Sequence, residues 1–175
     1  QPFSMDALPV MALSVSRLTA ALAGKMKKCL VLDLDNTLWG GVIGDDGLDG
    51  INLDPNHAVG EAYLDFQHTL KQYQERGVLL AVCSKNDQTI AAQVFKSHPY
   101  CYLKLSDFAA FIANWDNKAE NLRRIAQQLN IGLDSLVFFD DNPAEREIVS
   151  TMLPEVTVLD VPVDPAQFSV ALDKA

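Results

Sequence analysis

Apolar runs of strand length alternate with helix-like patterns from residue 29 to the end of the chain. Five runs are apolar almost throughout, which is typical of parallel strands buried on both faces, and they cover residues 29–33, 78–83, 101–105, 136–139 and 156–159. Apolar residues at three- and four-residue steps predict amphipathic helices over 59–73 and 122–129. A shorter helix is expected over 87–95, and another should begin at Pro143 with Asn142 as its N-cap. This order predicts an α/β fold with a doubly wound parallel sheet.

Two stretches fall outside this alternation. Residues 39–50 contain five glycines and a Gly-Asp-Asp-Gly turn, which favours a small hairpin or flap after the first strand over a helix. Such a flap would overhang the carboxyl end of that strand. Residues 1–24 include an Ala- and Leu-rich patch that ends at Gly24, and we expect an N-terminal linker or docking helix there. The remaining residues, 25–175, are expected to form one globular domain.

The composition narrows the class of protein. The chain has 175 residues, 49% of them hydrophobic, which suits one sizeable core and is too few for two ordinary domains. Its net charge of −9 argues against nucleic acid, because affinity for a phosphate backbone comes from clustered Lys and Arg. No apolar stretch reaches the roughly 18 residues of a membrane span. The cysteines Cys29, Cys83 and Cys101 have no metal-ligand spacing, which indicates reduced thiols and a cytoplasmic protein.

Polar residues follow three of the expected strands, at the edge where an open α/β sheet binds its ligands, and Lys118 opens the helix before the fourth strand. Asp33 and Asp35 end the first strand, and buried ionised carboxylates are costly unless a cation or hydrogen bonds compensate. The other members of this group are Thr37, Cys83, Ser84, Lys85, Asn86, Lys118, Asp140 and Asp141. The combination of acids, hydroxyls and lysines indicates a site for phosphate and a divalent metal.

Phosphoryl transfer requires these parts. A carboxylate can attack phosphorus to give an aspartyl-phosphate, while a nearby acid protonates the leaving oxygen and then activates water. Asp33 and Asp35 can supply that pair. The phosphate oxygens are neutralised by a hard divalent cation on carboxylates, opposite a lysine and hydroxyl donors, and Asp141, Lys118 and Ser84 suit these tasks.

These residues resemble, in order, the four motifs of the haloacid dehalogenase (HAD) superfamily of phosphohydrolases. The motifs are Asp-x-Asp-x-Thr at 33–37, Ser84, Lys118 and the acidic pair Asp140 and Asp141. The resemblance implies a HAD-like, Rossmann-like catalytic domain with a minimal cap. It makes Asp33 the nucleophile and a Mg²⁺ ligand, and Asp35 the acid/base and a ligand through its backbone carbonyl. Asp141 becomes the third ligand, although the resemblance leaves open which member of the acidic pair binds the ion. Substrate or phosphate would be bound by Thr37, Ser84, Lys85, Asn86 and Lys118.

Longer stretches narrow the resemblance. Residues 32–47, 83–87, 114–122 and 138–147 look like the FkbH-like branch of the superfamily, and the likeness covers residues 28 to about 160. Members of that branch are glyceryl transferase/phosphatases of polyketide biosynthesis. The resemblance implies that the chain dephosphorylates 1,3-bisphosphoglycerate and loads a glyceryl or related C3 unit, such as lactyl, onto an acyl carrier protein. An ordinary small-molecule or phosphoprotein phosphatase is the alternative.

Cys83 separates these two functions. A thiol at the site would carry the acyl group between two easier transfers, and Lys85 with the helix N-terminus near Asp87 could lower its pKa. The competing interpretation is a buried core cysteine at the end of an apolar run. Successive strand residues face opposite ways, so Cys83 and Ser84 both point into the site only if the strand has already ended.

The charges at 145–147 are interpreted as a solvated helix face.

Overall fold

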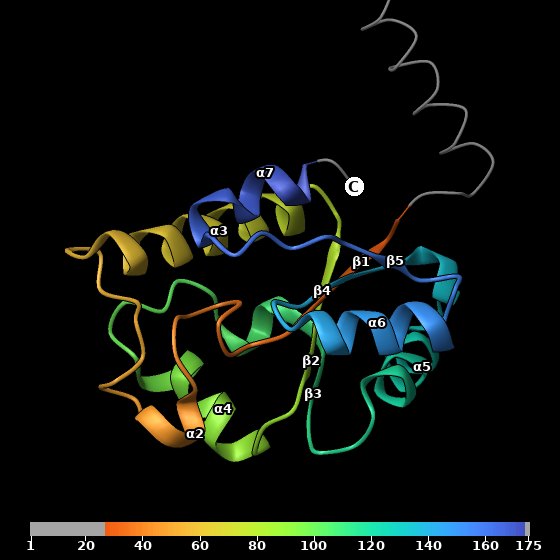
Figure 1. The fold of residues 1–175 in the computed structure, drawn as a ribbon, viewed down its shortest axis with the longest axis horizontal. Helices are drawn as coiled ribbons and strands as arrows, with labels where there is room; N and C mark the ends of the chain where they lie inside the picture. Colours follow the sequence, from red (N-terminus) through yellow and green to blue (C-terminus); the bar gives the residue numbers. More distant parts are fainter. Residues whose placement is uncertain (1–26, 174–175) are drawn as a thin grey trace, which may run out of the picture.

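The computed structural model describes residues 27–173, which form one parallel sheet with helices on both faces (Figure 1). The strands are β1 (Cys29–Leu32), β2 (Leu79–Ser84), β3 (Phe108–Ala113), β4 (Leu136–Phe139) and β5 (Thr157–Val158). They lie in the order β3-β2-β1-β4-β5, and every neighbouring pair is parallel. The order reverses beside the central β1, and a crevice opens at such a point beyond the carboxyl ends of the strands. The predicted doubly wound α/β fold is confirmed.

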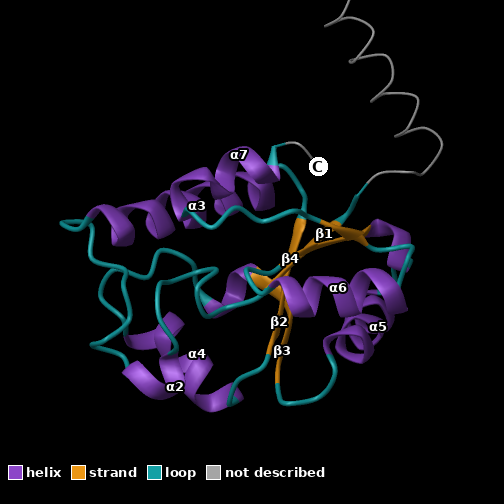
Figure 2. Ribbon diagram, viewed as in Figure 1, coloured by secondary structure: helices purple, strands orange, loops and turns teal. Residues whose placement is uncertain are grey.

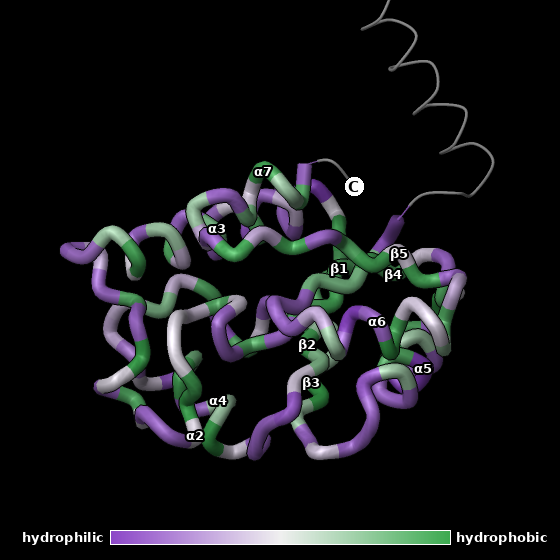
Figure 3. Tube along the Cα trace, in the orientation of Figure 1, coloured by the Kyte–Doolittle hydropathy of each residue, from purple (hydrophilic) through white to green (hydrophobic). Residues whose placement is uncertain are grey.

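Helices cover the two faces of the sheet (Figure 2). The longer ones are α3 (Ala58–Glu75), α4 (Gln88–Ser97), α5 (Lys118–Leu129), α6 (Pro143–Met152) and α7 (Phe168–Leu172). Leu30 and Leu32 of β1 join a core with α3, α4 and α7, whereas Cys29 and Val31 join a second core with α5 and α6. This alternation explains why the strands are apolar throughout, as the colouring of Figure 3 shows.

The expected helix starts are confirmed by their caps. The Asp87 side chain accepts hydrogen bonds from the amides of Thr89 and Ile90 at the start of α4. The Asn142 side chain accepts from the amide of Ala144, with Pro143 at the first helical position of α6. Both caps lie just beyond the carboxyl end of a strand, so the helices begin at the crevice.

The third strand was predicted at the wrong place. Residues 101–105 are a loop followed by a 3₁₀ turn (Leu105–Asp107), and the strand is β3, at Phe108–Ala113. The amides of Tyr102 and Leu103 donate to the side-chain oxygen of Gln67, which is fully buried on α3. Cys101 and Leu103 are therefore buried without a strand partner, because a glutamine from another element accepts from the backbone of this segment. Two further 3₁₀ turns lie at Leu133–Ser135 and Pro165–Gln167.

The glycine-rich segment at 39–50 is a flap, but its tip is not a hairpin. Gly40 and Asn52 form an antiparallel bridge at its base, and the tip is the one-turn helix α2 (Ile43–Asp46). The Asp46 carboxylate accepts from the Val42 amide, which closes this turn. Gly41 has φ +95°, a conformation that L side chains rarely adopt. The expected N-terminal linker or docking helix at 1–24 lies outside the described residues.

No helix within residues 27–173 is long and apolar enough to cross a membrane.

Candidate active site

A polar pocket of about 180 Å³ lies at the carboxyl ends of β1, β2 and β4. Six of the residues expected at the site line it: Asp33, Asp35, Ser84, Lys85, Lys118 and Asp141. Asn36, Asn142 and Glu145 complete the lining. Thr37, Asn86 and Asp140 are hydrogen-bonded or ion-paired to lining residues. The structure thus brings together every expected site residue except Cys83.

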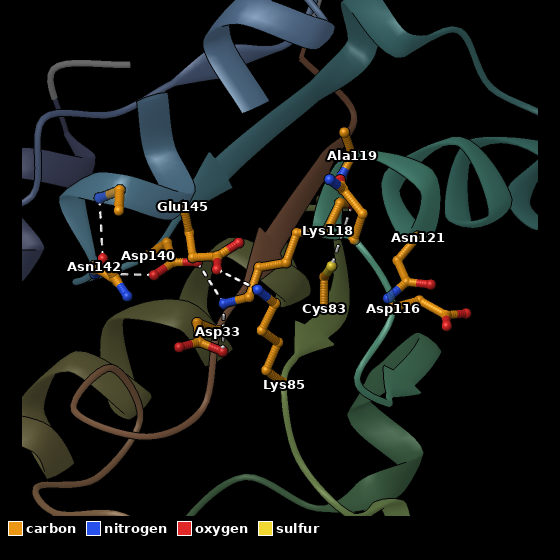
Figure 4. Close-up of polar contacts among 12 residues, drawn as sticks. Asp33, Cys83, Lys85, Asp116, Lys118, Ala119, Asn121, Asp140, Asn142 and Glu145 are labelled. Carbon is orange, nitrogen blue, oxygen red and sulfur yellow. Dashed lines mark hydrogen bonds and ion pairs between the residues drawn. The ribbon is translucent and has the colours of Figure 1, made fainter. Parts of the chain in front are cut away.

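Lys118 is a buried cation between two carboxylates (Figure 4). Its Nζ lies 3.0 Å from Asp33 Oδ1 and 2.6 Å from Asp140 Oδ2. Asn117 caps α5 and places Lys118 in its first turn, where the helix dipole disfavours a positive charge. Burial would lower the pKa of Lys118, but Asp33 and Asp140 raise it above the usual range, so the amine stays protonated.

Three carboxylates gather at the floor of the pocket. Oxygens of Asp33, Asp140 and Asp141 all lie within 4.8 Å of one another. Burial, followed by repulsion from Asp33, raises the pKa of Asp140 to about 6 and also raises that of Asp141. Asp33 Oδ1 is buried and accepts no hydrogen bond from residues 27–173, although Lys118 Nζ lies close to it. Crowded oxygen ligands with an incompletely satisfied member fit a hard divalent cation such as Mg²⁺.

The two acids after β4 have different surroundings. Asp140 is fully buried, and its oxygens are engaged by Lys118 Nζ at 2.6 Å and by the Asn142 amide at 2.9 Å. Asp141 lines the pocket, and its Oδ1 has one contact, with the Thr37 hydroxyl at 3.4 Å. This geometry makes Asp141 the more available ligand and gives Asp140 the task of holding Lys118 and the loop.

The flap holds Asp35. Its Oδ1 accepts from Trp39 Nε1 at 2.9 Å and from the Ile43 amide at 3.0 Å, and its Oδ2 accepts from Asn86 at 2.8 Å. Burial raises the pKa of Asp35 despite these three hydrogen bonds, and repulsion from Asp33 acts in the same direction. A carboxyl group with a raised pKa next to the Asp33 carboxylate is suited to proton donation.

The rim of the pocket carries an ion pair that the sequence did not indicate. Lys85 Nζ lies 2.5 Å from Glu145 Oε1, and the two side chains meet above Asp33 and Lys118 (Figure 4). Glu145 was interpreted as part of a solvated helix face, but it is buried and lines the pocket. Its position in the first turn of α6, directly after the acidic pair, was the available signal.

Arg146 is a second residue that the sequence interpretation missed. Its Nη1 donates to the backbone oxygens of Asp140 and Asp141, both at 2.8 Å. One guanidinium therefore fixes the two peptide groups of the loop that carries the acidic pair. Like Glu145, it was assigned to a solvated helix face.

The expectation that Cys83 faces the site needs correction. Cys83 is fully buried in the core beneath α5, and its thiol lies 3.7 Å from the Lys118 carbonyl oxygen (Figure 4). Ser84, the next residue of β2, lines the pocket instead, as strand alternation requires. Burial raises the pKa of Cys83 to about 12, against the expected lowering by Lys85 and the helix. The structure supports the interpretation of Cys83 as a core residue.

Comparisons with known proteins find solved structures that are similar to this chain. Neither a protein-family model nor a curated protein matches the chain. Among solved structures, the N-terminal part of BF1531 from Bacteroides fragilis contains a phosphatase domain complexed with Mg. It is 48% identical over 98% of this chain, with a TM-score of 0.89. The chain spans 46% of that structure, which is less than half its length.

Two more distant structures share the fold. The HAD-family enzyme bt-2542 from Bacteroides thetaiotaomicron, in complex with magnesium and inorganic phosphate, is 14% identical over 78% of this chain and 94% of its own, with a TM-score of 0.51. A phosphoserine phosphatase was solved as an analogue of its phospho-aspartyl intermediate. It is 15% identical over 86% of this chain and 91% of its own, with a TM-score of 0.50. These comparisons show that the chain is similar to a phosphatase domain that was solved with Mg, and that it shares its fold with a HAD-family enzyme and a phosphoserine phosphatase.

Proposed function

We propose that the chain hydrolyses small phosphorylated substrates through an aspartyl-phosphate on Asp33. The proposal is carried by one observation: Asp33 lies in the pocket wall within reach of Lys118 and of the acids Asp140 and Asp141. Asp33, Asp141 and the backbone carbonyl of Asp35 are the proposed Mg²⁺ ligands. When bound, the ion supplies positive charge that neutralises the phosphate oxygens.

The chain's own residues supply the remaining parts. An oxygen of the Asp33 carboxylate attacks phosphorus, and the leaving oxygen takes the proton of Asp35. Asp35 is then ionised, and it accepts a proton from the water that cleaves the aspartyl-phosphate. Lys118 and Ser84 donate hydrogen bonds to the phosphoryl oxygens throughout. Each group therefore has one task, which its place in the pocket supports.

Phosphate release tests this function. We expect wild-type protein to release inorganic phosphate from acetyl phosphate or phenyl phosphate only with Mg²⁺, and Asp33→Asn to lose at least about 10³-fold in rate. Asp65→Asn, an exposed acid on α3, is the matched control and should retain the rate. Unchanged phosphate release by Asp33→Asn would refute the assigned nucleophile.

We propose a more specific function from the FkbH-like resemblance. The chain would dephosphorylate 1,3-bisphosphoglycerate or a similar phosphorylated C3 acid and deliver its acyl group to an acyl carrier protein. Its support is that parts of all four resembling stretches line the pocket, which contains Asp33, Lys85, Lys118 and Asp141. The buried thiol of Cys83 is left out of this route. Hydrolysis at Asp33 removes the ester phosphate on the third carbon. The carrier's thiolate attacks the acyl carbon, and the acyl phosphate leaves as inorganic phosphate.

Mass spectrometry of the carrier separates the finer function from simple hydrolysis. After incubation with 1,3-bisphosphoglycerate, Mg²⁺ and this chain, the carrier protein should gain the mass of one glyceryl group. The same gain should appear with Cys83→Ala, because that thiol has no part in the route. Phosphate release without acylation of the carrier would contradict the acyl-transfer function and support simple hydrolysis.

A further inference from the structure

The catalytic pocket is too small for a phosphate ester with a large organic group. Its volume is about 180 Å³, whereas cavities that hold small organic ligands span about 300–1,000 Å³. Its lining is dominated by acids, lysines, asparagines and a serine, which suit a phosphoryl group and its metal ion. The organic part of a substrate must therefore extend beyond this pocket.

A second cavity adjoins the catalytic pocket. Its volume is about 330 Å³, and Asn36 and Asp141 line both cavities. Three other cavities share no residue with the catalytic pocket. One lies at the amino ends of β2 and β3, one lies beside α7, and one lies between α3 and residues 165–169. The second cavity is therefore placed to receive the group attached to phosphorus.

One wall of the second cavity is apolar. The wall is formed by Pro143, Val161, Pro162, Val163 and Phe168. Val161 and Phe168 are buried in the core, and Phe168 packs edge-on against Tyr63, with ring centroids 6.0 Å apart. Val163 is fully exposed, which places it at the mouth. The wall is thus anchored in the core and offers apolar contact to a ligand.

Two polar side chains complete the lining. The Tyr63 hydroxyl donates to the Asn36 carbonyl oxygen at 3.4 Å, and burial followed by the nearby Asp141 raises the pKa of Tyr63 to about 12. The hydroxyl therefore stays a donor at neutral pH. Arg146 Nη1 donates to two backbone oxygens, whereas the partner of its Nη2 among residues 27–173 is the exposed Asp160 carboxylate, 3.8 Å away. Arg146 Nη2 can donate to an acceptor on a ligand, whereas the one Tyr63 hydroxyl hydrogen would first have to leave the Asn36 carbonyl oxygen.

We propose that this second cavity binds the leaving group of the substrate and selects an organic group that has an apolar surface and a hydrogen-bond acceptor. The proposal rests on the phosphatase function proposed above. It makes residues 161–168, rather than the flap at 39–50, the part of the chain that determines substrate choice.

Binding of two phosphonates tests the proposal, because their carbon–phosphorus bond is not hydrolysed. Isothermal titration calorimetry with Mg²⁺ should show phenylphosphonate binding wild-type protein about tenfold more tightly than methylphosphonate, from burial of the ring. Val163→Trp narrows the mouth, so the ratio should fall towards one while the affinity for methylphosphonate stays unchanged. Val59→Trp, an exposed position on α3 that lines neither cavity, should keep the wild-type ratio.

Several outcomes would overturn the proposal. They are a wild-type ratio near one, no binding of phenylphosphonate, a ratio that Val163→Trp leaves unchanged, and an equal loss of affinity for both ligands. Hydrolysis of phenyl phosphate is measured separately. A preserved affinity ratio without hydrolysis would refute the phosphatase function and leave the assignment of the cavity intact.

Discussion

Lys118 is a single buried cation that stabilises carboxylates which would otherwise repel one another. Its ammonium lies between Asp33 and Asp140, and all three side chains are at least nine-tenths buried. Removing one partner of a buried ion pair is strongly destabilising, because the remaining charges stay buried without compensation. A bound divalent cation would replace part of the lost positive charge.

We expect Lys118→Met to lower the free energy of unfolding by about 3 kcal/mol in EDTA. Saturating Mg²⁺ should recover part of this loss, because the ion binds the folded state. Thermal unfolding with and without Mg²⁺ measures both effects, and Lys96→Met, an exposed lysine on α4, is the control. A loss of stability that Mg²⁺ does not reduce would argue against a metal ion next to Lys118.

The thiols make a second prediction at the residue scale. Burial raises the pKa of Cys29 and Cys83 to about 12 and that of Cys101 to about 11, so hardly any thiolate is present at pH 8. Native protein should react slowly with a thiol reagent, whereas the denatured chain should react rapidly at all three cysteines. Rapid labelling of Cys83 in the native protein, located by peptide mapping, would restore it as a candidate acyl carrier.

At the scale of elements, the first turn of α6 does more than begin a helix. The sequence predicts its start and its cap, but a polar first turn looks the same whether it faces solvent or a site. Folding brings Glu145 to Lys85 and brings Arg146 to the backbone of the acidic pair. Both contacts depend on β2, β4 and α6 meeting at one edge of the sheet.

Arg146→Gln should weaken Mg²⁺ binding about tenfold, because the carbonyl groups of Asp140 and Asp141 lose their shared donor. Calorimetric titration with Mg²⁺ measures this affinity without turnover. Arg146→Lys keeps a donor group and should recover part of the lost Mg²⁺ affinity. Arg76→Gln, at the exposed end of α3, should bind as wild type does. Equal Mg²⁺ affinity in Arg146→Gln and wild type would contradict the positioning role.

A second link between elements predicts a pH dependence. Asp107, before β3, accepts from Lys71 Nζ on α3 at 2.6 Å and from the Lys104 amide at 2.8 Å. Burial alone would raise the pKa of Asp107, but these hydrogen bonds lower it below its usual value. The stabilisation is therefore present at neutral pH and is lost as the pH falls through the lowered pKa.

We expect Asp107→Asn to cost about 1 kcal/mol of stability at pH 7. The difference from wild type should begin to shrink below about pH 4, where Asp107 of the unfolded wild-type chain takes up a proton, and should continue to fall until the folded carboxyl group is protonated as well. Urea unfolding at pH 7 and pH 3 measures both values. An equal difference at the two pH values would show that the charge of Asp107 is not what stabilises this contact.

The sequence predicts helices and strands best where a local pattern of residues is compatible with a single structure. The run at 136–139 and the cap at Asn142 appear in the structure as expected. The run at 101–105 is as apolar as a strand, and only the buried Gln67, from a helix more than 30 residues earlier, shows why it is a loop. The direction in which the Cys83 side chain points depends on the residue at which β2 ends. A shift of that end by one residue would turn the side chain from the core to the pocket, and the sequence does not locate the end that closely.

At the scale of the whole molecule, the residues of the candidate active site meet because three strands end at the same edge of the sheet. Asp33 follows β1, Ser84 ends β2 and Asp140 follows β4, and β1 lies between the other two. The order of the motifs in the sequence therefore predicts the catalytic pocket. It does not predict the second cavity, whose walls come from α3, α6 and the segment after β5.

Trapping the phosphorylated protein tests the central claim most directly. Wild-type protein is mixed with acetyl phosphate and Mg²⁺, quenched in acid within milliseconds, digested and mapped by mass spectrometry. We predict one phosphoryl group on the peptide that contains Asp33, and none on any peptide of Asp33→Asn. A phosphoryl group on another residue, or an unchanged adduct in Asp33→Asn, would contradict the assignment of Asp33 as the nucleophile.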